Sequence, residues 1–370
     1  MEGRVSGAYA NWDDVNTRRA WVKDPKLLVP AAAGRSGRPL LVLDEIHKAR
    51  LWKRNLKGLF DTLESPLDIL VTGSARLNVY KKGSDSLLGR YFHFRLHPFS
   101  VRELAWPAPA SPDEALAGLA SRSQRPRPST REALAGLMRF GGFPEPFLAQ
   151  NERLARLWRR GRVEKVVRED LRDISRIPEL SRVEMLAALL PERVGSLFSV
   201  SSLREDLEVA HDTVSRWLGY LRELFYVFEV KPYARSIRRS LRKEGKLYLW
   251  DWSEIDVEPA RFENLVASHL LKACDTWTDT GEGAFELYLL RDKEKREIDF
   301  LITRDRRPWL PVEVKLNDPT PSTAFRAFLP QLGCRFGLQI VHAPDVWATH
   351  GVGDAQVLVA SAAEALGYFA

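Results

Sequence analysis

Three carboxylates and a lysine in the last third of the sequence have the spacing of a metal-dependent hydrolytic site. Asp299 lies in the run Glu-Ile-Asp-Phe-Leu-Ile, and Glu313 and Lys315 lie in Pro-Val-Glu-Val-Lys-Leu. Alternate residues of a strand share a face, so pairing of these runs brings the side chains together, and Glu263 on a preceding helix can join them. Carboxylates bind Mg²⁺, and the metal activates water. The pattern predicts phosphodiester cleavage with Glu263, Asp299 and Glu313 as metal ligands and Lys315 as catalytic lysine.

The D-x₁₃-E-x-K spacing of these residues resembles the PD-(D/E)xK nuclease superfamily, the fold of many restriction endonucleases. The expected order of helix, three strands, helix and strand over residues 259–345 agrees with that resemblance. Such a fold can lose catalysis and keep binding, so the resemblance does not by itself establish cleavage. The alternative is a charged solvent face on a half-exposed sheet.

A second acidic pair, Asp44 and Glu45, ends the apolar run Pro-Leu-Leu-Val-Leu. Such a run is typical of a strand buried on both faces of a parallel sheet, and ligands bind at the carboxyl edge of these sheets. In nucleotide hydrolases of this architecture the Asp holds Mg²⁺ and the Glu orients a water molecule. The alternative is that Asp44 caps the next helix and Glu45 lies in its first turn.

Further side chains near this pair suit a phosphate. The neighbouring apolar run, residues 67–72, leads to Ser74, whose hydroxyl can lie beside a γ-phosphate. Arg76 and Arg90 can stabilise phosphate charge. A helical pattern over residues 51–63 separates the two runs, so strand, helix and strand predict a βαβ unit.

Several motifs of the sequence resemble, in the same order, those of the predicted AAA+ superfamily ATPases of bacteria and archaea. They are Tyr-Ala-Asn-Trp-Asp-Asp from 9, Leu-Asp-Glu-Ile-His-Lys from 43, Val-Thr-Gly-Ser-Ala-Arg from 71, Ser-Leu-Leu-Gly-Arg-Tyr from 86, Leu-His-Pro-Phe-Ser from 96 and Gly-Gly-Phe-Pro-Glu-Pro from 141. The resemblance covers nearly the whole chain, and residues 180–342 look like the family's C-terminal domain of unknown function. It implies Asp44 and Glu45 as the Walker B acids, Ser74 as a sensor-like residue and Arg90 as an arginine finger.

One motif of that family is missing, because no G-x-x-x-x-G-K-[ST] occurs in the sequence. The phosphate-binding loop should precede the Walker B strand by a full strand and helix, and its N–H groups and Lys bind the phosphates. We therefore expect weak or no ATP hydrolysis from the chain as written. A start codon placed too late and a degenerate ATPase are both consistent with this.

The elements that position these residues group into four regions. Residues 1–105 predict the Walker B half of an AAA+-like parallel-sheet core, and residues 106–180 predict a linker and a helical lid. Residues 181–250 predict three helices and two strands, which suggests a winged helix-turn-helix. Residues 251–370 predict the nuclease-like domain, so the expected class is α/β, with a truncated P-loop core, a lid, a winged helix and a restriction-endonuclease-like domain.

A basic segment lies between the two strands of the predicted wing. From Lys231 to Lys246 the sequence has seven lysines and arginines against one acid, Glu244. A concentrated positive charge favours a polyanion partner, and the alternative is a solvated loop. The residues expected to bind nucleic acid are Arg235, Arg238, Arg239, Arg242 and Lys243.

The composition limits the class of protein. The chain has 370 residues, 45% hydrophobic and 28% charged, with a net charge of +7, so it is globular and not globally disordered. Two cysteines exclude a disulfide framework and a multi-cysteine zinc site. No apolar stretch reaches the length of a membrane span or a signal core, so a cytoplasmic protein is expected.

Two functions follow from these residues. In the first, an ATPase is coupled to a DNA-binding, nuclease-like half, with Mg²⁺ and ATP as cofactors and DNA as the partner. In the second, the chain binds nucleic acid without catalysis and its ATPase core is vestigial. A third alternative is an adaptor that binds an acidic protein. No membrane is expected as a partner, and an oligomer remains open.

Overall fold

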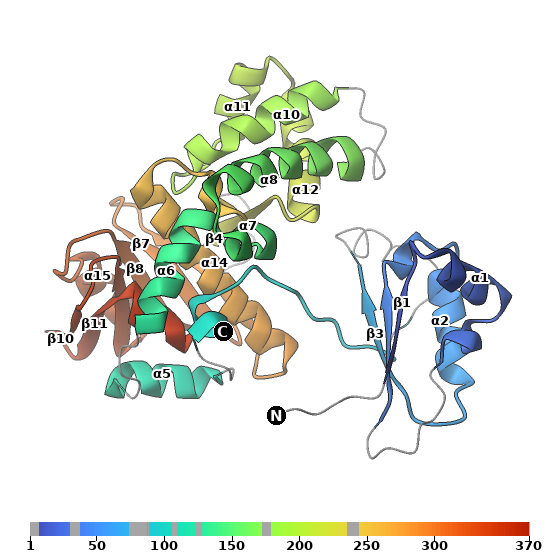
Figure 1. Ribbon diagram of the computed structural model, residues 1–370. Coiled ribbons are helices and arrows are strands. Elements are labelled where there is room, and N and C mark those ends of the chain that lie inside the picture. The colour runs from blue at the N-terminus through green and yellow to red at the C-terminus, as the bar shows by residue number, and fades with distance from the viewer. Residues whose placement is uncertain are drawn as a thin grey trace. The chain divides into compact units, whose positions relative to one another are not determined.

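The structure, a computed structural model, describes residues 7–29, 38–73, 87, 89–105, 110–122, 128–171, 179–234 and 244–369. The chain divides into two compact units, Met1–Phe92 and His93–Ala370, called unit 1 and unit 2 below. Figure 1 shows the elements of both units, and each unit is described by itself. None of the described helices combines the length and the apolar character that a bilayer crossing requires.

Unit 1 is a parallel sheet with helices between its strands. The described strands pair side by side in the order β1-β2-β3, and all run parallel. In chain order the elements are β1 Gly7–Asn11, α1 Val15–Lys23, η1 Pro25–Leu28, β2 Leu40–Asp44, η2 Ile46–Lys48, α2 Trp52–Asp61 and β3 Asp68–Thr72. The strand, helix and strand predicted from residue 39 to residue 72 are therefore confirmed.

The core of unit 1 lies against one face of β2, the middle strand of the described sheet. Leu41 and Leu43 are both 0% exposed, and Trp21 of α1 and Leu59 of α2 belong to the same core cluster. Leu40 and Val42, which alternate with Leu41 and Leu43, are only half-buried, so the described residues bury one face of β2 and do not show the predicted burial on both faces.

Unit 2 is built on a mixed sheet of eight described strands, in the order β10-β11-β9-β8-β7-β6-β4-β5. The strands are β4 Val227–Pro232, β5 Lys246–Leu249, β6 Phe285–Arg291, β7 Glu297–Arg304, β8 Arg307–Lys315, β9 Phe336–Val341, β10 Trp347–Val352 and β11 Ala355–Ser361. The predicted strands near 285, 297 and 311 are confirmed as β6, β7 and β8. β10 and β11 were not predicted from the sequence.

Two helices cover opposite faces of this sheet. α14 (Glu258–Asp279) contacts β5, β6, β7 and β8, whereas α15 (Ala324–Leu332) contacts β7, β9 and β11. Ile298 of β7 packs in a core cluster with residues of α15. The next residue, Asp299, points to the other face, where α14 lies.

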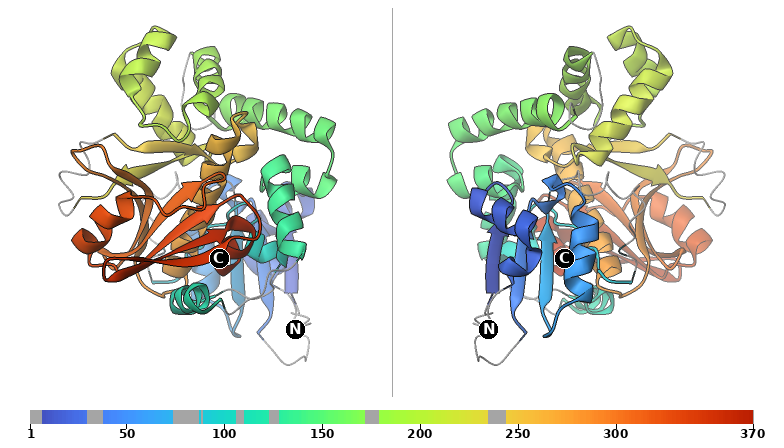
Figure 2. Two further views of the ribbon diagram at one scale, coloured as in Figure 1. Left: turned by 90° about the vertical axis from the view of Figure 1, so that its left-hand side faces the viewer. Right: turned by 90° about the vertical axis from the view of Figure 1, so that its right-hand side faces the viewer.

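The remaining described helices of unit 2 connect and cap the sheet. They are α4 Val101–Ala105, α5 Pro112–Ser121, α6 Pro128–Phe140, α7 Pro144–Ala149, α8 Glu152–Glu164, the π-helical turn Lys165–Asp170, α10 Leu180–Leu189, η5 Leu190–Arg193, α11 Val200–Leu207, α12 His211–Glu223, η6 Trp252–Glu254, α16 Ala362–Ala365 and η7 Leu366–Tyr368. Figure 2 shows the green and yellow helices of residues 150–224 at one end of unit 2, beyond the orange and red sheet.

The hairpin of β4 and β5, which the sequence analysis places in a wing, is also the edge of the large sheet. β4 pairs with β5 antiparallel and with β6 in parallel, through Lys231 opposite Tyr288 and Pro232 opposite Leu289. All four residues of β5 are buried. A wing that stands free in solvent cannot bury both faces of a strand, and β5 is instead covered by α14, η5 and η6, which contact it.

Some residues singled out in the sequence lie outside the described residues. They are Ser74, Arg76, Arg235, Arg238, Arg239, Arg242 and Lys243. Their assigned roles stay predictions.

Candidate functional site

The predicted nuclease-like residues lie next to one another on unit 2. β7 and β8 pair antiparallel with Phe300 opposite Val312, which brings Asp299 beside Glu313. The Asp299 N–H donates to Glu313 Oε2 at 3.3 Å, and the Val314 N–H donates to Asp299 Oδ2 at 2.9 Å. Lys315 Nζ lies 2.8 Å from Glu313 Oε1.

A lysine that the sequence analysis did not assign to this site lies at its centre. Lys246 Nζ is 3.1 Å from Glu263 Oε1, 2.7 Å from Glu297 Oε1 and 3.1 Å from Asp299 Oδ1. The Lys246 side chain is only 4% exposed. These contacts confirm that Glu297 and Asp299 share a face of β7. The residues Lys246, Glu263, Glu297, Asp299, Glu313 and Lys315 are called the carboxylate centre below.

Tyr248 completes the contacts of Glu263. Residues 246 and 248 point to the same side of β5, and the Tyr248 hydroxyl donates to Glu263 Oε1 at 2.7 Å. The sequence signal for Lys246 was its position as the first residue of the strand Lys-Leu-Tyr-Leu. From the sequence, Lys246 was assigned only to the basic segment between residues 231 and 246.

Burial and charge act in opposite directions on the groups of this centre. Burial and the nearby Asp299 raise the pKa of Glu263 to about 7, and the same causes raise the pKa of Glu313 to about 7. Burial acts to lower the pKa of Lys246, but the surrounding carboxylates outweigh it and hold that pKa well above its ordinary value. Lys246 is therefore charged at neutral pH.

The carboxylate centre does not fit the Mg²⁺ ion that its resemblance implies. Among the described residues, no group of three or more His, Cys, Asp and Glu side chains is arranged to hold a metal ion. Glu263 Oε1 and Asp299 Oδ1 contact the Lys246 ammonium. Asp299 Oδ2 accepts the Val314 N–H, and Glu313 contacts the Lys315 ammonium and the Asp299 N–H. No step through a metal follows from this arrangement.

The acidic pair of unit 1 lies where the three described strands end. Asn11, Asp44 and Thr72 occupy one level of the sheet. The Tyr9 hydroxyl donates to Asp44 Oδ2 at 2.5 Å, and Asn11 Nδ2 donates to the same oxygen at 3.0 Å. The Thr72 hydroxyl donates to Asp44 Oδ1. The hydrogen bonds from Thr72 and Tyr9 hold the pKa of Asp44 below its ordinary value, so Asp44 is ionised at neutral pH.

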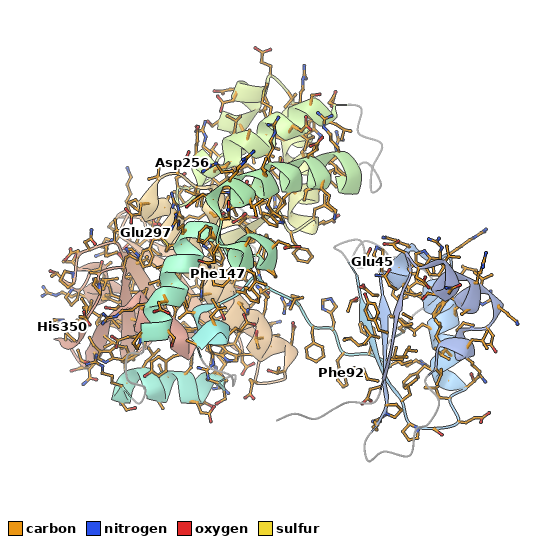
Figure 3. The ribbon with its side chains drawn as sticks, in the orientation of Figure 1. Glu45, Phe92, Phe147, Asp256, Glu297 and His350 are labelled. Atoms are coloured by element: carbon orange, nitrogen blue, oxygen red, sulfur yellow. The ribbon has the colours of Figure 1, made fainter. Side chains whose placement is uncertain are left out.

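Glu45 follows Asp44 in a left-handed conformation, with φ of 57°. Its N–H donates to the Thr72 carbonyl at 3.1 Å, which turns the chain sharply at the sheet edge, the position labelled in Figure 3. The Glu45 carboxylate pairs with Lys48 Nζ at 3.1 Å, and Lys48 also contacts Asp13 at 2.8 Å. A non-glycine residue in this region is uncommon and clusters at functional sites.

Arg90 is not part of this edge. Its guanidinium donates to Asp61 at 2.9 Å and 3.3 Å. Asp61 ends α2, which runs back from the carboxyl end of β2 to the start of β3, so the Arg90 contact lies at the opposite edge of the sheet from Asp44. The structure therefore does not bring Arg90 to the acidic pair.

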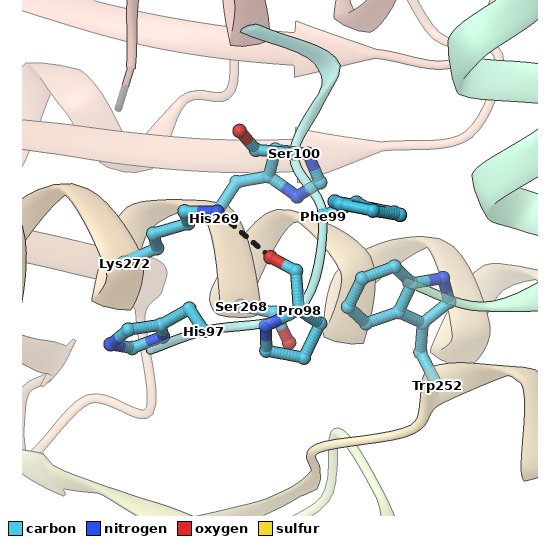
Figure 4. A pocket seen from close by; sticks show the side chains of 8 residues that line it. All are labelled: His97, Pro98, Phe99, Ser100, Trp252, Ser268, His269 and Lys272. Carbon is cyan, nitrogen blue, oxygen red and sulfur yellow. Dashed lines mark hydrogen bonds between the residues drawn. The ribbon is translucent and has the colours of Figure 1, made fainter. Parts of the chain in front are cut away.

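A small pocket marks where the Leu-His-Pro-Phe-Ser motif packs on α14, as Figure 4 shows. His97 Nε2 lies 2.9 Å from Asp275, and Lys272 Nζ donates to the Pro98 carbonyl at 2.9 Å. Burial lowers the pKa of His269 to about 4, and this neutral ring accepts the Val101 N–H at 3.0 Å. These contacts anchor residues 95–101 to the helix that carries Glu263.

The Gly-Gly-Phe-Pro-Glu-Pro motif packs at the same place. A Cβ on Gly141 would lie 2.5 Å from Asp251 Oδ1, and one on Gly142 would lie 2.6 Å from the Trp252 ring. Gly141 also has a φ of +79°, so both its space and its backbone require glycine. These two motifs therefore have a packing role.

Comparison with known proteins gives three regions of similarity. Residues 4–105 match the family described as "AAA domain". Residues 131–253 match "Domain of unknown function (DUF8612)", and residues 260–344 match "Domain of unknown function (DUF4143)". The chain thus carries an ATPase-like region, similar to AAA domains, followed by regions similar to domains of unknown function.

The relatives include uncharacterized proteins of bacteria and an archaeon. The chain is 25% identical over 321 residues to one of Mycobacterium tuberculosis, covering 84% of this chain and 65% of that protein. It is 25% identical over 224 residues to one of Methanocaldococcus jannaschii, covering 56% of this chain and 46% of that protein. It is 20% identical over 240 residues to one of Haemophilus influenzae, covering 62% of this chain and 56% of that protein. The chain spans less than two thirds of each of these relatives, and no solved structure matches it.

Proposed function

We propose that the protein is an AAA-type ATP-binding protein whose unit 2 binds nucleic acid, with the nucleotide state of unit 1 controlling that binding. The observation that carries the proposal is the edge of unit 1, where Asp44 and Glu45 follow a buried parallel strand and Thr72 ends its neighbour. The match of residues 4–105 to the AAA domain family supports it.

The contacts of Asp44 leave it able to bind a cation. Its hydrogen bonds come from neutral donors, a phenol, an amide and a hydroxyl. Oδ2 accepts two of these bonds and Oδ1 accepts one. Asp44, which is ionised at neutral pH, is the residue that would hold Mg²⁺, and Glu45 would orient water. A bound Mg²⁺ would neutralise charge on the nucleotide phosphates.

The phosphate cradle is the part of the site that this sequence lacks, since it contains no G-x-x-x-x-G-K-[ST]. Without the backbone N–H groups and the lysine of that loop, the β- and γ-phosphates of a nucleotide lose most of their hydrogen-bond and charge partners. We therefore expect this chain to bind Mg²⁺–ATP weakly, through the acidic edge, and not to turn it over.

The first test is the thermal unfolding of the chain with and without Mg²⁺–ATP. A ligand at ten times its dissociation constant stabilises the folded state by about 1.4 kcal/mol. The Asp44→Asn variant should lose that stabilisation. Asp68→Asn is the matched control, because Asp68 starts β3 at the opposite edge of the sheet. An equal shift in the Asp44→Asn variant, or none in the wild type at millimolar ligand, would overturn the proposal.

The nucleic-acid part of the proposal is supported by α8 as well as by the basic segment. Arg153, Arg156 and Arg160 are exposed and lie three and four residues apart, so they form one stripe along the helix. On the packed side, Arg159 donates to the Ser253 carbonyl and Arg162 pairs with Glu254 at 3.0 Å. The helix therefore divides its arginines between a structural face and an exposed, positive face, on which Arg156 also lies 4.0 Å from Glu152.

The second test is the salt dependence of DNA binding. Each phosphate contact contributes about 0.9 to the slope of log K against log salt. The double variant Arg153→Gln/Arg160→Gln should lower the slope by up to about 1.8 if both residues touch phosphates. Arg326→Gln/Arg335→Gln is the control, because both residues are exposed elsewhere on unit 2. Wild-type binding that is independent of salt would favour the alternative of an acidic protein partner.

A further inference from the structure

We propose that the Lys246 ammonium is the built-in cation of the carboxylate centre and takes the place that a divalent metal ion would occupy there. The inference goes beyond the function proposed above and does not depend on it. Its consequence is that this centre does not carry out metal-dependent cleavage.

The contacts of Lys246 are those of a complete cation site. An ammonium group has three donors and no acceptor. Three carboxylates, Glu263, Glu297 and Asp299, lie within 3.1 Å of its nitrogen, so each donor has an anionic partner. Two of these acids belong to the metal-ligand set that the D-x₁₃-E-x-K pattern predicts.

A metal ion and the ammonium cannot occupy this centre together. A hard divalent cation binds carboxylate oxygens at about 2.0 to 2.6 Å. An ion shared by Glu263 Oε1 and Asp299 Oδ1 would need the space that Lys246 Nζ fills, 3.1 Å from both oxygens. The two positive charges would also repel each other in a buried site. Metal binding therefore requires the lysine to leave.

The backbone on both sides of Lys246 holds the lysine in place. Lys246 pairs with Val230 of β4 on one side and forms a bridge with Leu197 on the other. The preceding residue, Gly245, has no room for a side chain, since a Cβ there would lie 2.7 Å from the Val230 carbonyl. Tyr248, two residues on, is 0% exposed. Strand pairing therefore fixes the Lys246 backbone beside the acids, and its side chain, only 4% exposed, is enclosed there.

The other acids of the centre have cations of their own. Lys315 pairs with Glu313 at 2.8 Å, and Arg291 pairs with Glu297 at 2.6 Å. The charge of the centre is thus balanced largely by side chains of this chain. A centre that awaits a metal ion would instead leave several acids facing one another without cations.

The test is Mn²⁺ binding to the full chain, measured by electron paramagnetic resonance. All proteins carry Asp44→Asn, so that the acidic edge of unit 1 does not contribute. Removing the ammonium with Lys246→Ala should create a Mn²⁺ site at least about tenfold tighter than any in the parent protein. Lys315→Ala is the matched control, since it removes a lysine from the same centre and leaves Lys246 in place. Equal Mn²⁺ affinity in the parent and in the Lys246→Ala variant would overturn the proposal.

A second measurement needs no change at Lys246 and covers the case in which that variant fails to fold. Amine acylation of the wild-type protein, read by mass spectrometry, should modify Lys315, whose side chain is 42% exposed, and spare Lys246, at 4%. Millimolar Mn²⁺ should leave this pattern unchanged. If Mn²⁺ made Lys246 as reactive as Lys315, the metal would be displacing the lysine, and the proposal would be wrong.

Discussion

Replacing Glu263 by glutamine should change how the stability of unit 2 depends on pH. The acids of the carboxylate centre outnumber the cations paired with them by one. The acids are Glu263, Glu297, Asp299 and Glu313, and the cations are Lys246, Lys315 and Arg291. Burial and the neighbouring Asp299 raise the pKa of Glu263 and of Glu313 to about 7. The centre should therefore take up a proton as the pH falls through about 7, which removes the excess negative charge.

The sign and size of the effect follow from the pKa of Glu263. Its ordinary value is 4.5, and the folded value is about 7, so the folded protein binds this proton more tightly. The contribution to the free energy of unfolding is full below the ordinary value and is lost as the pH rises to about 7. The difference between the two pKa values corresponds to a free energy of about 3 kcal/mol, as an upper limit. Glutamine never ionises, so the variant does not lose this contribution. The free energy of unfolding of Glu263→Gln, relative to that of the wild type, should therefore rise by up to about 3 kcal/mol from about pH 5 to about pH 8.

The assay is urea unfolding at a series of pH values, followed by hydrogen exchange of the α14 amides, which report on unit 2. His269 titrates in both proteins and cancels in the difference between them. The control is Glu258→Gln, on the exposed first turn of the same helix. The difference in free energy of unfolding between this variant and the wild type should not change with pH. Parallel curves for Glu263→Gln and the wild type would mean that Lys246 keeps Glu263 ionised throughout. They would refute the reasoning.

Two further changes test the packing of the motif at 141 and the edge of unit 1. Gly141→Ala should destabilise unit 2 by about 1 to 3 kcal/mol in chemical unfolding, because its Cβ would lie 2.5 Å from Asp251 Oδ1 at a φ of +79°. Gly219→Ala, in open space within α12, should instead stabilise by up to about 1 kcal/mol, and equal losses in both would contradict the explanation. Thr72→Val removes the hydroxyl that the Asp44 carboxylate accepts from, and should cost unit 1 about 1 kcal/mol at neutral pH. Because the pKa of Asp44 is depressed, this cost should shrink as the pH falls and Asp44 protonates, which an acid titration of thermal stability measures.

The sequence was sufficient to predict local elements and the side chains that share a face of a strand. Alternation placed Glu297 and Asp299 together, and both contact Lys246. The continuous apolar run before Asp44 predicted a strand of a parallel sheet buried on both faces; β2 is a strand of a parallel sheet, but only its Leu41 and Leu43 face is fully buried. These predictions succeed because strand periodicity is a property of neighbouring residues.

The contacts that define the carboxylate centre and the edge of unit 1 could not be predicted from local sequence patterns. Lys246 reaches Asp299 only because β4 pairs with β6 and brings the hairpin to the sheet, and no local pattern specifies that pairing. The three donors to Asp44 depend on the register of three strands. Arg90 was assigned as a phosphate-binding residue from its type and its place in the sequence, and its partner Asp61 is set by how α2 runs back along the sheet.

The two acidic centres differ in the kind of group that satisfies them, and this difference decides where a metal ion can act. Asp44 accepts hydrogen bonds from neutral donors, which hold the carboxylate ionised and in place but do not cancel its charge. The acids around Lys246 face an ammonium at 2.7 to 3.1 Å, which cancels charge and fills the space. An added divalent cation would gain from the first arrangement and would have to displace a buried ion pair in the second, a step that costs several kcal/mol. Mg²⁺ binding in this chain is therefore expected at the edge of unit 1, and Asp44→Asn should remove it while Asp299→Asn should not.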